Sequence, residues 1–135
     1  MDVFVYGTLT NPERVADVVD SYVFVGPATL SGLPLVEGRY PTLAPGGEAA
    51  GRLLRTDDVA SIDAYEGVDD GLYVRVSVPR TDSGTAAVYV GDPDRLDAAA
   101  TWPEGDGFEA RVRAYLSRSI LLTTADTKSR GKPSK

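Results

Sequence analysis

Short apolar runs recur along the chain, and the clearest of them alternates with polar residues. In 72–80, LYVRVSVPR, the aliphatic residues occupy every second position, which predicts a strand with one buried face. After a TDSG turn, the apolar stretch 84–91 predicts a second strand. We therefore expect these two strands to pair as a hairpin.

Other stretches change to a helical period. In 9–20, LTNPERVADVVD, Thr10 and Glu13 have the spacing of a capping box, and Pro12 suits a first helical turn. The valines that follow recur on one side of a helix. This pattern predicts a helix directly after the first apolar run of the chain.

Two more helices are predicted further along. In 57–67, DDVASIDAYEG, Asp57 can cap the beginning and Gly67 is expected to end the helix. The stretch 106–122 carries apolar residues at helical spacing, and we expect it to form the last helix.

The remaining apolar runs are short and rich in β-formers, and Pro and Gly separate them. They predict strands at 3–6, 21–32 with a break near its Gly-Pro pair, 33–38 and 49–56. The resulting order is β-α-β-β-β-α-β-β-α, with too few helices to cross over between each pair of strands. This order predicts one α+β domain over 1–122 with a curled, barrel-like mixed sheet. The basic segment 123–135 is expected to be a disordered tail.

Composition limits the chemistry available. The chain has no Cys and no His, which excludes a disulfide framework, a thiolate nucleophile and His-dependent triads. All three Lys fall in the last eight residues. Carboxylates are therefore the main candidates for acid–base work. The segment 92–97, DPDRLD, resembles a calcium loop but lacks its glycine and terminal glutamate, so no calcium site is expected there.

The net charge of the chain indicates which kinds of partner it can bind. Up to residue 125 the chain has 10 Arg against 19 Asp and Glu, a formal charge of −9, which disfavours binding to nucleic acid. No apolar run approaches the roughly 20 residues of a membrane helix. No basic segment precedes the first strand as in a signal peptide, so a cytoplasmic location is expected. An acidic surface that uses Arg in place of Lys also suits a high-salt environment. The sequence does not determine an oligomeric state.

Glu66 stands out by its position. A carboxylate in the last turn of a helix faces the negative end of the helix dipole, which costs roughly 0.3–1 kcal/mol at an exposed site. The same dipole and partial burial raise a carboxyl pKa towards the range useful for a general base. The alternative is a solvated helix-end residue, or one that pairs with Arg75.

The stretch 3–9, VFVYGTL, is the second candidate. A strand that runs through a glycine into a helix leaves backbone N–H groups free to hold an anion or an oxyanion. The stretch has too few glycines for a phosphate-binding loop or a dinucleotide fingerprint. It also fits a plain turn in which Tyr6 is a core aromatic. The nearby RYP segment, 39–41, is a candidate for the wall of a cleft.

These pieces together resemble the gamma-glutamylcyclotransferase-like (AIG2-like) family. VFVYGTL is similar to the first strand and substrate loop of that family, and GRYPTL to its Tyr-Pro segment. IDAYEG followed by YVR resembles its Leu-Asp-x-x-Glu-Gly and Tyr-x-Arg pair. The resemblance spans residues 3 to about 103. Arg52 departs from the family pattern, since an acidic residue is common there.

The resemblance implies a small mixed β-barrel with flanking helices and a cavity at one end. It implies that Glu66 is the catalytic acid and base of a metal-free, cofactor-free cyclisation that converts a γ-glutamyl amine or amino acid to 5-oxoproline. The substrate would be bound by six residues: Tyr6, Gly7, Thr8, Leu9, Tyr73 and Arg75. Two alternatives stay open, namely a non-catalytic barrel that binds a small ligand and an accessory protein adapted to salt or stress.

Overall fold

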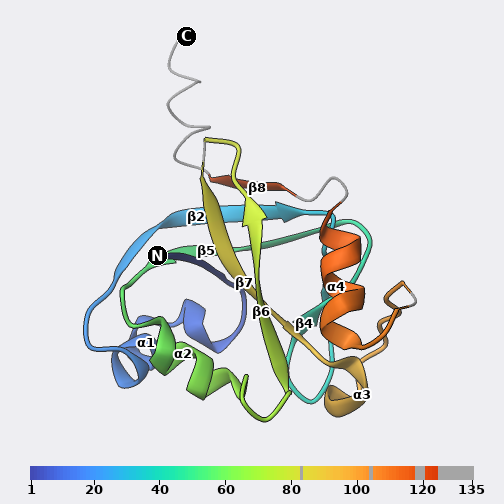
Figure 1. Cartoon of the computed structure of the whole chain (residues 1–135). Coiled ribbons are helices and arrows are strands. Elements are labelled where there is room, and N and C mark those ends of the chain that lie inside the picture. Colours follow the sequence, from blue (N-terminus) through green and yellow to red (C-terminus); the bar gives the residue numbers. More distant parts are fainter. Residues whose placement is uncertain (83, 104, 118–120, 125–135) are drawn as a thin grey trace, which may run out of the picture.

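The computed structural model describes residues 1–82, 84–103, 105–117 and 121–124 (Figure 1). Within them, one curled sheet of six strands carries the fold. Its strands in spatial order are β6 (Tyr73–Pro79), β7 (Thr85–Gly91), β1 (Asp2–Val5), β5 (Glu48–Arg55), β2 (Val23–Ser31) and β8 (Leu121–Thr124). The β1–β7 pair is parallel and the other neighbours are antiparallel.

The sheet curls far enough for its two edges to meet at one end. Arg80, directly after β6, forms a parallel bridge with Leu122 of β8, and the Thr81 N–H donates to the Leu122 carbonyl at 2.9 Å. A separate two-stranded ribbon joins β3 (Leu35–Val36) to β4 (Thr42–Leu43). The predicted α+β class with a barrel-like mixed sheet is therefore confirmed.

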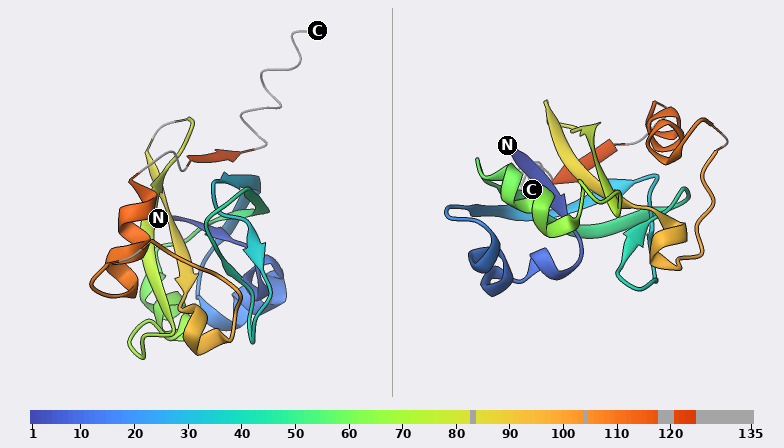
Figure 2. Two further views of the ribbon diagram at one scale, coloured as in Figure 1. Left: turned by 90° about the vertical axis from the view of Figure 1, so that its right-hand side faces the viewer. Right: turned by 60° about the horizontal axis from the view of Figure 1, so that its bottom comes forward.

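Short helices flank this sheet. They are the 3-10 helix η1 (Thr8–Thr10) and the α-helices α1 (Pro12–Val18), α2 (Val59–Glu66), α3 (Pro93–Leu96) and α4 (Phe108–Leu116). Helices η1 and α1 lie on the opposite side of the molecule from α4 (Figure 2). No helix in the described part of the chain has the length and apolar character needed to span a bilayer.

Alternation along the strands divides the core in two. In β1, Phe4 points into the curl of the sheet, where Leu30, Leu53 and Val88 are also buried. Its neighbours Val3 and Val5 point to the other side and pack in a cluster with residues of α1 and α2. The period of two in the sequence thus supplies both a barrel interior and a surface that holds the helices.

Several predicted elements are confirmed. The hairpin pairs β6 with β7 in register from Tyr73 opposite Gly91 to Pro79 opposite Thr85. Gly67 ends α2 in the left-handed conformation, with φ of 72°. Strand β1 occupies the expected place.

The predicted caps were wrong by one residue each. Asn11, not Thr10, caps α1, because its side-chain oxygen accepts from the Glu13 N–H at 2.9 Å. The Thr10 hydroxyl instead donates to the Gly7 carbonyl within the preceding turn. Helix α2 has Asp58 at its N-cap position in place of Asp57.

Two strand boundaries also differ. Strand β2 passes through its Gly-Pro pair, because an irregularity in register between Phe24 and Gly26 absorbs the predicted break. The stretch between the predicted strands 33–38 and 49–56 contains β4, whose two residues pair with β3.

The last predicted helix was too long. Helix α4 ends at Leu116, and 121–124 forms β8, because β2 offers an open edge with which this apolar segment pairs. Helix α3 was not predicted; Asp92 caps it by accepting from the Asp94 N–H. Residues 118–120, and 125–135 of the predicted tail, lie outside the described residues.

The approach of β5 to β1 depends on Gly51, and this generates a prediction. A Cβ at this position would overlap the Val5 carbonyl oxygen and lie 2.9 Å from the Phe4 ring. Gly51→Ala is expected to lower the free energy of unfolding by about 2 kcal/mol in urea denaturation, since the strands must separate to admit the methyl group. Gly47→Ala is the control, because a Cβ there meets nothing within 4 Å. Equal effects of the two substitutions would contradict this account of the packing.

Candidate active site

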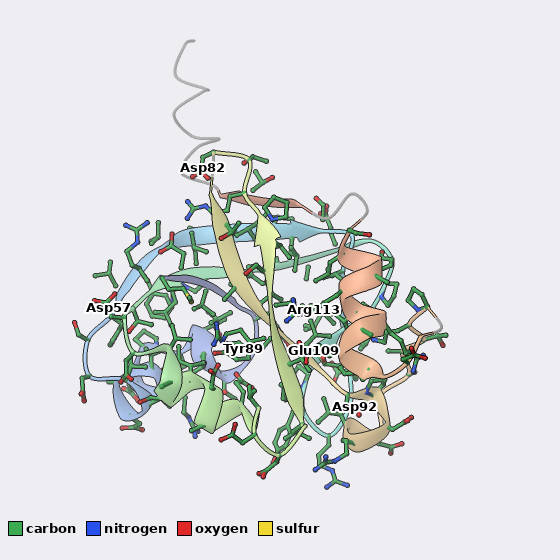
Figure 3. The ribbon with its side chains drawn as sticks, in the orientation of Figure 1. Asp57, Asp82, Tyr89, Asp92, Glu109 and Arg113 are labelled. Carbon is green, nitrogen blue, oxygen red and sulfur yellow. The ribbon has the colours of Figure 1, made fainter. Side chains whose placement is uncertain are left out.

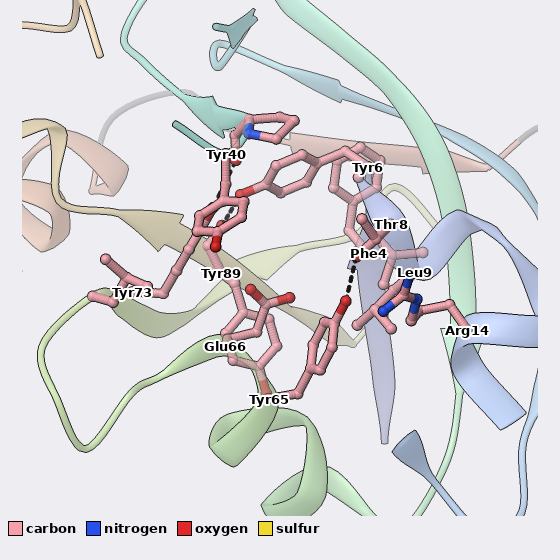
Figure 4. Close-up of a pocket in the computed structure, with 14 residues that line it drawn as sticks. Phe4, Tyr6, Thr8, Leu9, Arg14, Tyr40, Tyr65, Glu66, Tyr73 and Tyr89 are labelled. Carbon is pink, nitrogen blue, oxygen red and sulfur yellow. Dashed lines mark hydrogen bonds between the residues drawn. The ribbon is translucent and has the colours of Figure 1, made fainter. Parts of the chain in front are cut away.

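A cavity of about 460 Å³ opens where β1 ends and the chain enters η1 (Figure 4). The end of α2, the beginning of β6, part of β7 and the segment around Tyr40 complete its wall. The lining residues are Phe4, Val5, Tyr6, Gly7, Thr8, Leu9, Arg14, Tyr40, Pro41, Tyr65, Glu66, Leu72, Tyr73 and Tyr89.

The end of α2 directs Glu66 into this cavity. The left-handed turn at Gly67 reverses the chain, and the Leu72 N–H donates back to the Gly67 carbonyl at 3.0 Å. A Cβ on Gly67 would lie 3.2 Å from Leu72 in addition to the strain of its positive φ. The glycine therefore ends the helix just after Glu66 and allows the close return of the chain to β6.

Burial controls the charge of Glu66. Its carboxyl takes part in no hydrogen bond or ion pair among the described residues, and burial raises its pKa from 4.5 to about 7. Removal from water disfavours the charged form of a carboxyl, and no cation in the described part of the chain pairs with Glu66 to compensate. The predicted alternative of a Glu66–Arg75 pair was wrong, because Arg75 binds Asp63 instead.

Tyrosines form most of the polar wall around this carboxyl. Five of the seven in the chain line the cavity. The Tyr6 hydroxyl donates to the Tyr89 carbonyl at 2.5 Å, and the Tyr73 hydroxyl donates to the Pro41 carbonyl at 2.8 Å. Burial raises the pKa of both phenols, so they stay neutral and fixed.

The loop after β1 forms the facing wall. The N–H groups of Thr8 and Leu9 belong to the first turn of η1 and therefore have no acceptor within that helix. A Cβ on Gly7 would meet nothing within 4 Å, so this stretch borders open space. Across the mouth, the Thr8 Oγ1 and the Tyr65 hydroxyl lie 2.7 Å apart in a hydrogen bond that joins η1 to α2.

The loop is held from behind by Arg52, the residue that departs from the family pattern. Its guanidinium donates to the Thr10 carbonyl at 2.9 Å and lies 3.7 Å from the centroid of the Phe24 ring. Arg52 is not part of the cavity wall, so its charge supports the loop without facing the cavity.

Six of the seven predicted site residues line the cavity together: Glu66, Tyr6, Gly7, Thr8, Leu9 and Tyr73. Arg75 does not, because its side chain is turned to Asp63. Tyr40 and Pro41, from the predicted RYP wall segment, also line it. Within the described residues, no group of three or more Asp and Glu side chains is gathered closely enough to hold a metal ion.

The prediction missed Arg14, Tyr65 and Tyr89. Tyr65 precedes Glu66 in the sequence, and its position in the last turn of the helix was the one available signal. Tyr89 is an inconspicuous member of an apolar strand, and Arg14 is an exposed residue of α1. Their convergence depends on how β7 and α1 pack against β1, which local patterns do not specify.

Three solved structures illustrate the likeness of this fold to known proteins. A gamma-glutamyl cyclotransferase aligns with 85% of this chain and 97% of its own at 18% identity and a TM-score of 0.55. An uncharacterized human protein aligns with 84% and 96% at 18% identity and a TM-score of 0.59. The Escherichia coli protein ytfP aligns with 75% and 93% at 27% identity and a TM-score of 0.57.

Comparison with curated proteins gave no match. A family model described as "Gamma-glutamyl cyclotransferase, AIG2-like" matches residues 3–119, which include every residue of the cavity wall. The chain therefore belongs to the gamma-glutamyl cyclotransferase, AIG2-like family.

Proposed function

We propose that this protein cyclises a γ-glutamyl amine or amino acid to 5-oxoproline and releases the amine, with Glu66 as the acid and base. The observation that carries the proposal is the half-buried, unpaired Glu66 carboxyl in a tyrosine-lined cavity. A carboxyl with a pKa near neutrality, in one cavity with the backbone N–H groups of the first turn of η1, suits a proton transfer coupled to an oxyanion. Membership of the family supports the same reaction class.

The reaction needs no nucleophile from the protein. The α-ammonium group of the substrate gives a proton to the Glu66 carboxylate, and the resulting amine attacks the γ-carbonyl carbon. The new C–N bond closes a five-membered ring, and the carbonyl oxygen becomes an oxyanion. Glu66 returns the proton to the departing nitrogen as the old C–N bond breaks. The ring nitrogen gives its second proton to the released amine, which leaves as an ammonium ion, so protons and charge balance over the cycle.

The cavity supplies orientation and charge stabilisation in this proposal. The N–H groups of Thr8 and Leu9 hold the oxyanion or the substrate carboxylate, and the phenols of Tyr6 and Tyr73 fix the glutamyl chain. Arg14 on the exposed rim faces the same space and attracts anionic substrates. Holding the amine against the carbonyl contributes about 7–11 kcal/mol to lowering the barrier.

Replacement of the acid–base group tests the proposal directly. Glu66→Gln keeps the size of the side chain and removes the proton acceptor, so kcat should fall by about 10²–10⁴-fold. The assay follows 5-oxoproline released from a panel of γ-glutamyl amino acids and γ-glutamyl amines. Glu37→Gln, an exposed glutamate outside the cavity, is the matched control and should keep wild-type kcat.

A Glu66→Gln variant as fast as the wild type would remove Glu66 from the mechanism. If no member of the panel reacts with the wild-type protein, the cyclotransferase proposal fails, and the binding barrel becomes the better description of this fold.

The pH dependence of the wild-type enzyme follows from the raised pKa. Glu66 accepts a proton only as a carboxylate, so kcat/KM should rise about tenfold per pH unit below pH 7 and level off above it. The measurement is a pH–rate profile from pH 4 to 8 under substrate-limited conditions. An acidic limb near 4.5, the pKa from which that of Glu66 is raised, would show that the reacting group is not buried.

The same burial predicts a stability cost. Folded Glu66 takes up its proton near pH 7 and unfolded Glu66 near 4.5, so the folded state binds more protons between these values. Wild-type stability should therefore fall as pH rises through this window, and Glu66→Gln should lack this fall. Urea denaturation should show the variant more stable by up to about 3 kcal/mol at pH 8, and little different at pH 4.5. A pH-independent difference would contradict the assignment.

A further inference from the structure

Asp63 lies one helical turn before Glu66 on α2, and both of its carboxylate oxygens are bound. The Arg75 Nε donates to Oδ1 at 2.9 Å and the Arg75 Nη2 to Oδ2 at 3.1 Å. The Tyr89 hydroxyl donates to Oδ1 at 2.6 Å. Arg75 belongs to β6 and Tyr89 to β7, so a single carboxylate joins the helix to both strands of the hairpin.

The hairpin register explains why the two donors meet. Arg75 and Tyr89 are directly opposite one another on β6 and β7, so their side chains lie on the same face of the sheet. Tyr89 lies between β7 and α2 (Figure 3). The paired strands therefore offer Asp63 a guanidinium and a phenol side by side, and this fixes the helix above them.

Tyr89 connects this anchor to the cavity. Its side chain lines the cavity with Glu66, and its carbonyl accepts the Tyr6 hydroxyl (Figure 4). Burial raises the pKa of Tyr89, the hydrogen bond with Asp63 raises it further, and the charge of Glu66 adds to the effect. Both carboxyls of α2 thus act on one phenol, which means that Asp63 and Glu66 lie within electrostatic reach of the same point.

The charge of Arg75 has a consequence for this arrangement. Two carboxylates one turn apart on a helix face repel each other. This repulsion disfavours ionisation of the more deeply buried carboxyl. The bidentate Arg75 neutralises Asp63, and the pair has side chains only 36% and 25% exposed. Glu66 is left with the effect of burial alone.

We propose that Asp63 and Arg75 are positioning residues for Glu66: their neutral pair fixes the last turns of α2 against the β6–β7 hairpin and keeps net charge away from the Glu66 carboxyl. The inference rests on the proposed function of Glu66 as acid and base. It assigns a mechanistic role to Arg75 through Asp63 in place of direct contact with substrate.

The other ionisable groups around Glu66 do not supply this balance. Tyrosines line the same cavity from the position directly after β1, from β6, β7, the segment before β4 and α2 itself: Tyr6, Tyr73, Tyr89, Tyr40 and Tyr65. Phenols are neutral in the pH range of interest. Arg14 faces the cavity from α1 but is exposed to solvent, which screens its charge.

A cycle of single and double variants of Asp63 and Arg75 tests the proposal. The quantity measured is the pH at which kcat/KM begins to fall on the acidic side of its pH profile, the acidic limb. Arg75→Gln leaves Asp63 uncompensated and should move the limb to higher pH by about 0.5 unit. Asp63→Asn leaves Arg75 uncompensated and should move it to lower pH. The double variant Asp63→Asn/Arg75→Gln restores neutrality, so its limb should return to the wild-type position although the ion pair is gone.

Arg75→Lys separates position from charge. It keeps the cation but loses the two-point contact with Asp63, so kcat should fall about 3–10-fold while KM and the limb stay unchanged. If all four variants keep the wild-type limb and differ only in unfolding midpoint, the pair has a purely structural role and the proposal is overturned. Failure of the double variant to return to the wild-type limb would overturn it as well.

A second measurement keeps this test separate from the test of the reaction. The Glu66 carboxyl can be titrated by ¹³C NMR on glutamate-labelled protein without substrate, its resonance assigned by loss in Glu66→Gln. Opposite pKa shifts in Arg75→Gln and Asp63→Asn that cancel in the double variant support charge balance even where no substrate is turned over. Unshifted titration in an active enzyme overturns the charge balance and leaves the proposed reaction intact.

Discussion

The Glu66 carboxyl is held in a half-buried cavity where tyrosines make up most of the polar side chains, and it has no ion pair among the described residues to offset the loss of water. A carboxyl in such a place raises its pKa instead of paying the full cost of a buried charge. Much of the surrounding structure can be understood as what fixes that group. Gly67 ends the helix immediately after it, and Asp63 ties the preceding turn to the sheet.

Because the sheet curls, a few residues from distant parts of the chain are enough to build the site. Parallel pairing of β1 with β7 places the end of β1 beside the middle of the hairpin, so Tyr6 reaches the Tyr89 carbonyl 83 positions away. The bridge between Arg80 and Leu122 brings the two edges together at one end of the sheet. Loops and helix ends then surround a cavity that the strands themselves do not fill.

Two carboxylates on one short helix thus have different environments. Asp63 is bound by a cation and a phenol, while Glu66 has burial without compensation. Different environments for neighbouring carboxyls are a general way to separate a structural charge from a reactive one. The difference in environment here depends on the register of β6 and β7, which brings Arg75 and Tyr89 to the same point.

Local chemistry in the sequence determined the hairpin alternation, the glycine that ends α2, the exclusion of thiol and imidazole chemistry, and Glu66 as the electrostatic anomaly of its helix. These features depend on residues only a few positions apart. The tertiary structure alone decided that Arg75 serves Asp63, that Tyr65 and Tyr89 enter the cavity wall, and that 121–124 joins β2 as a strand. Such contacts join residues far apart in the chain. Their energy depends on the register of the paired strands and on which strand edges are left open for pairing, and no local pattern encodes either.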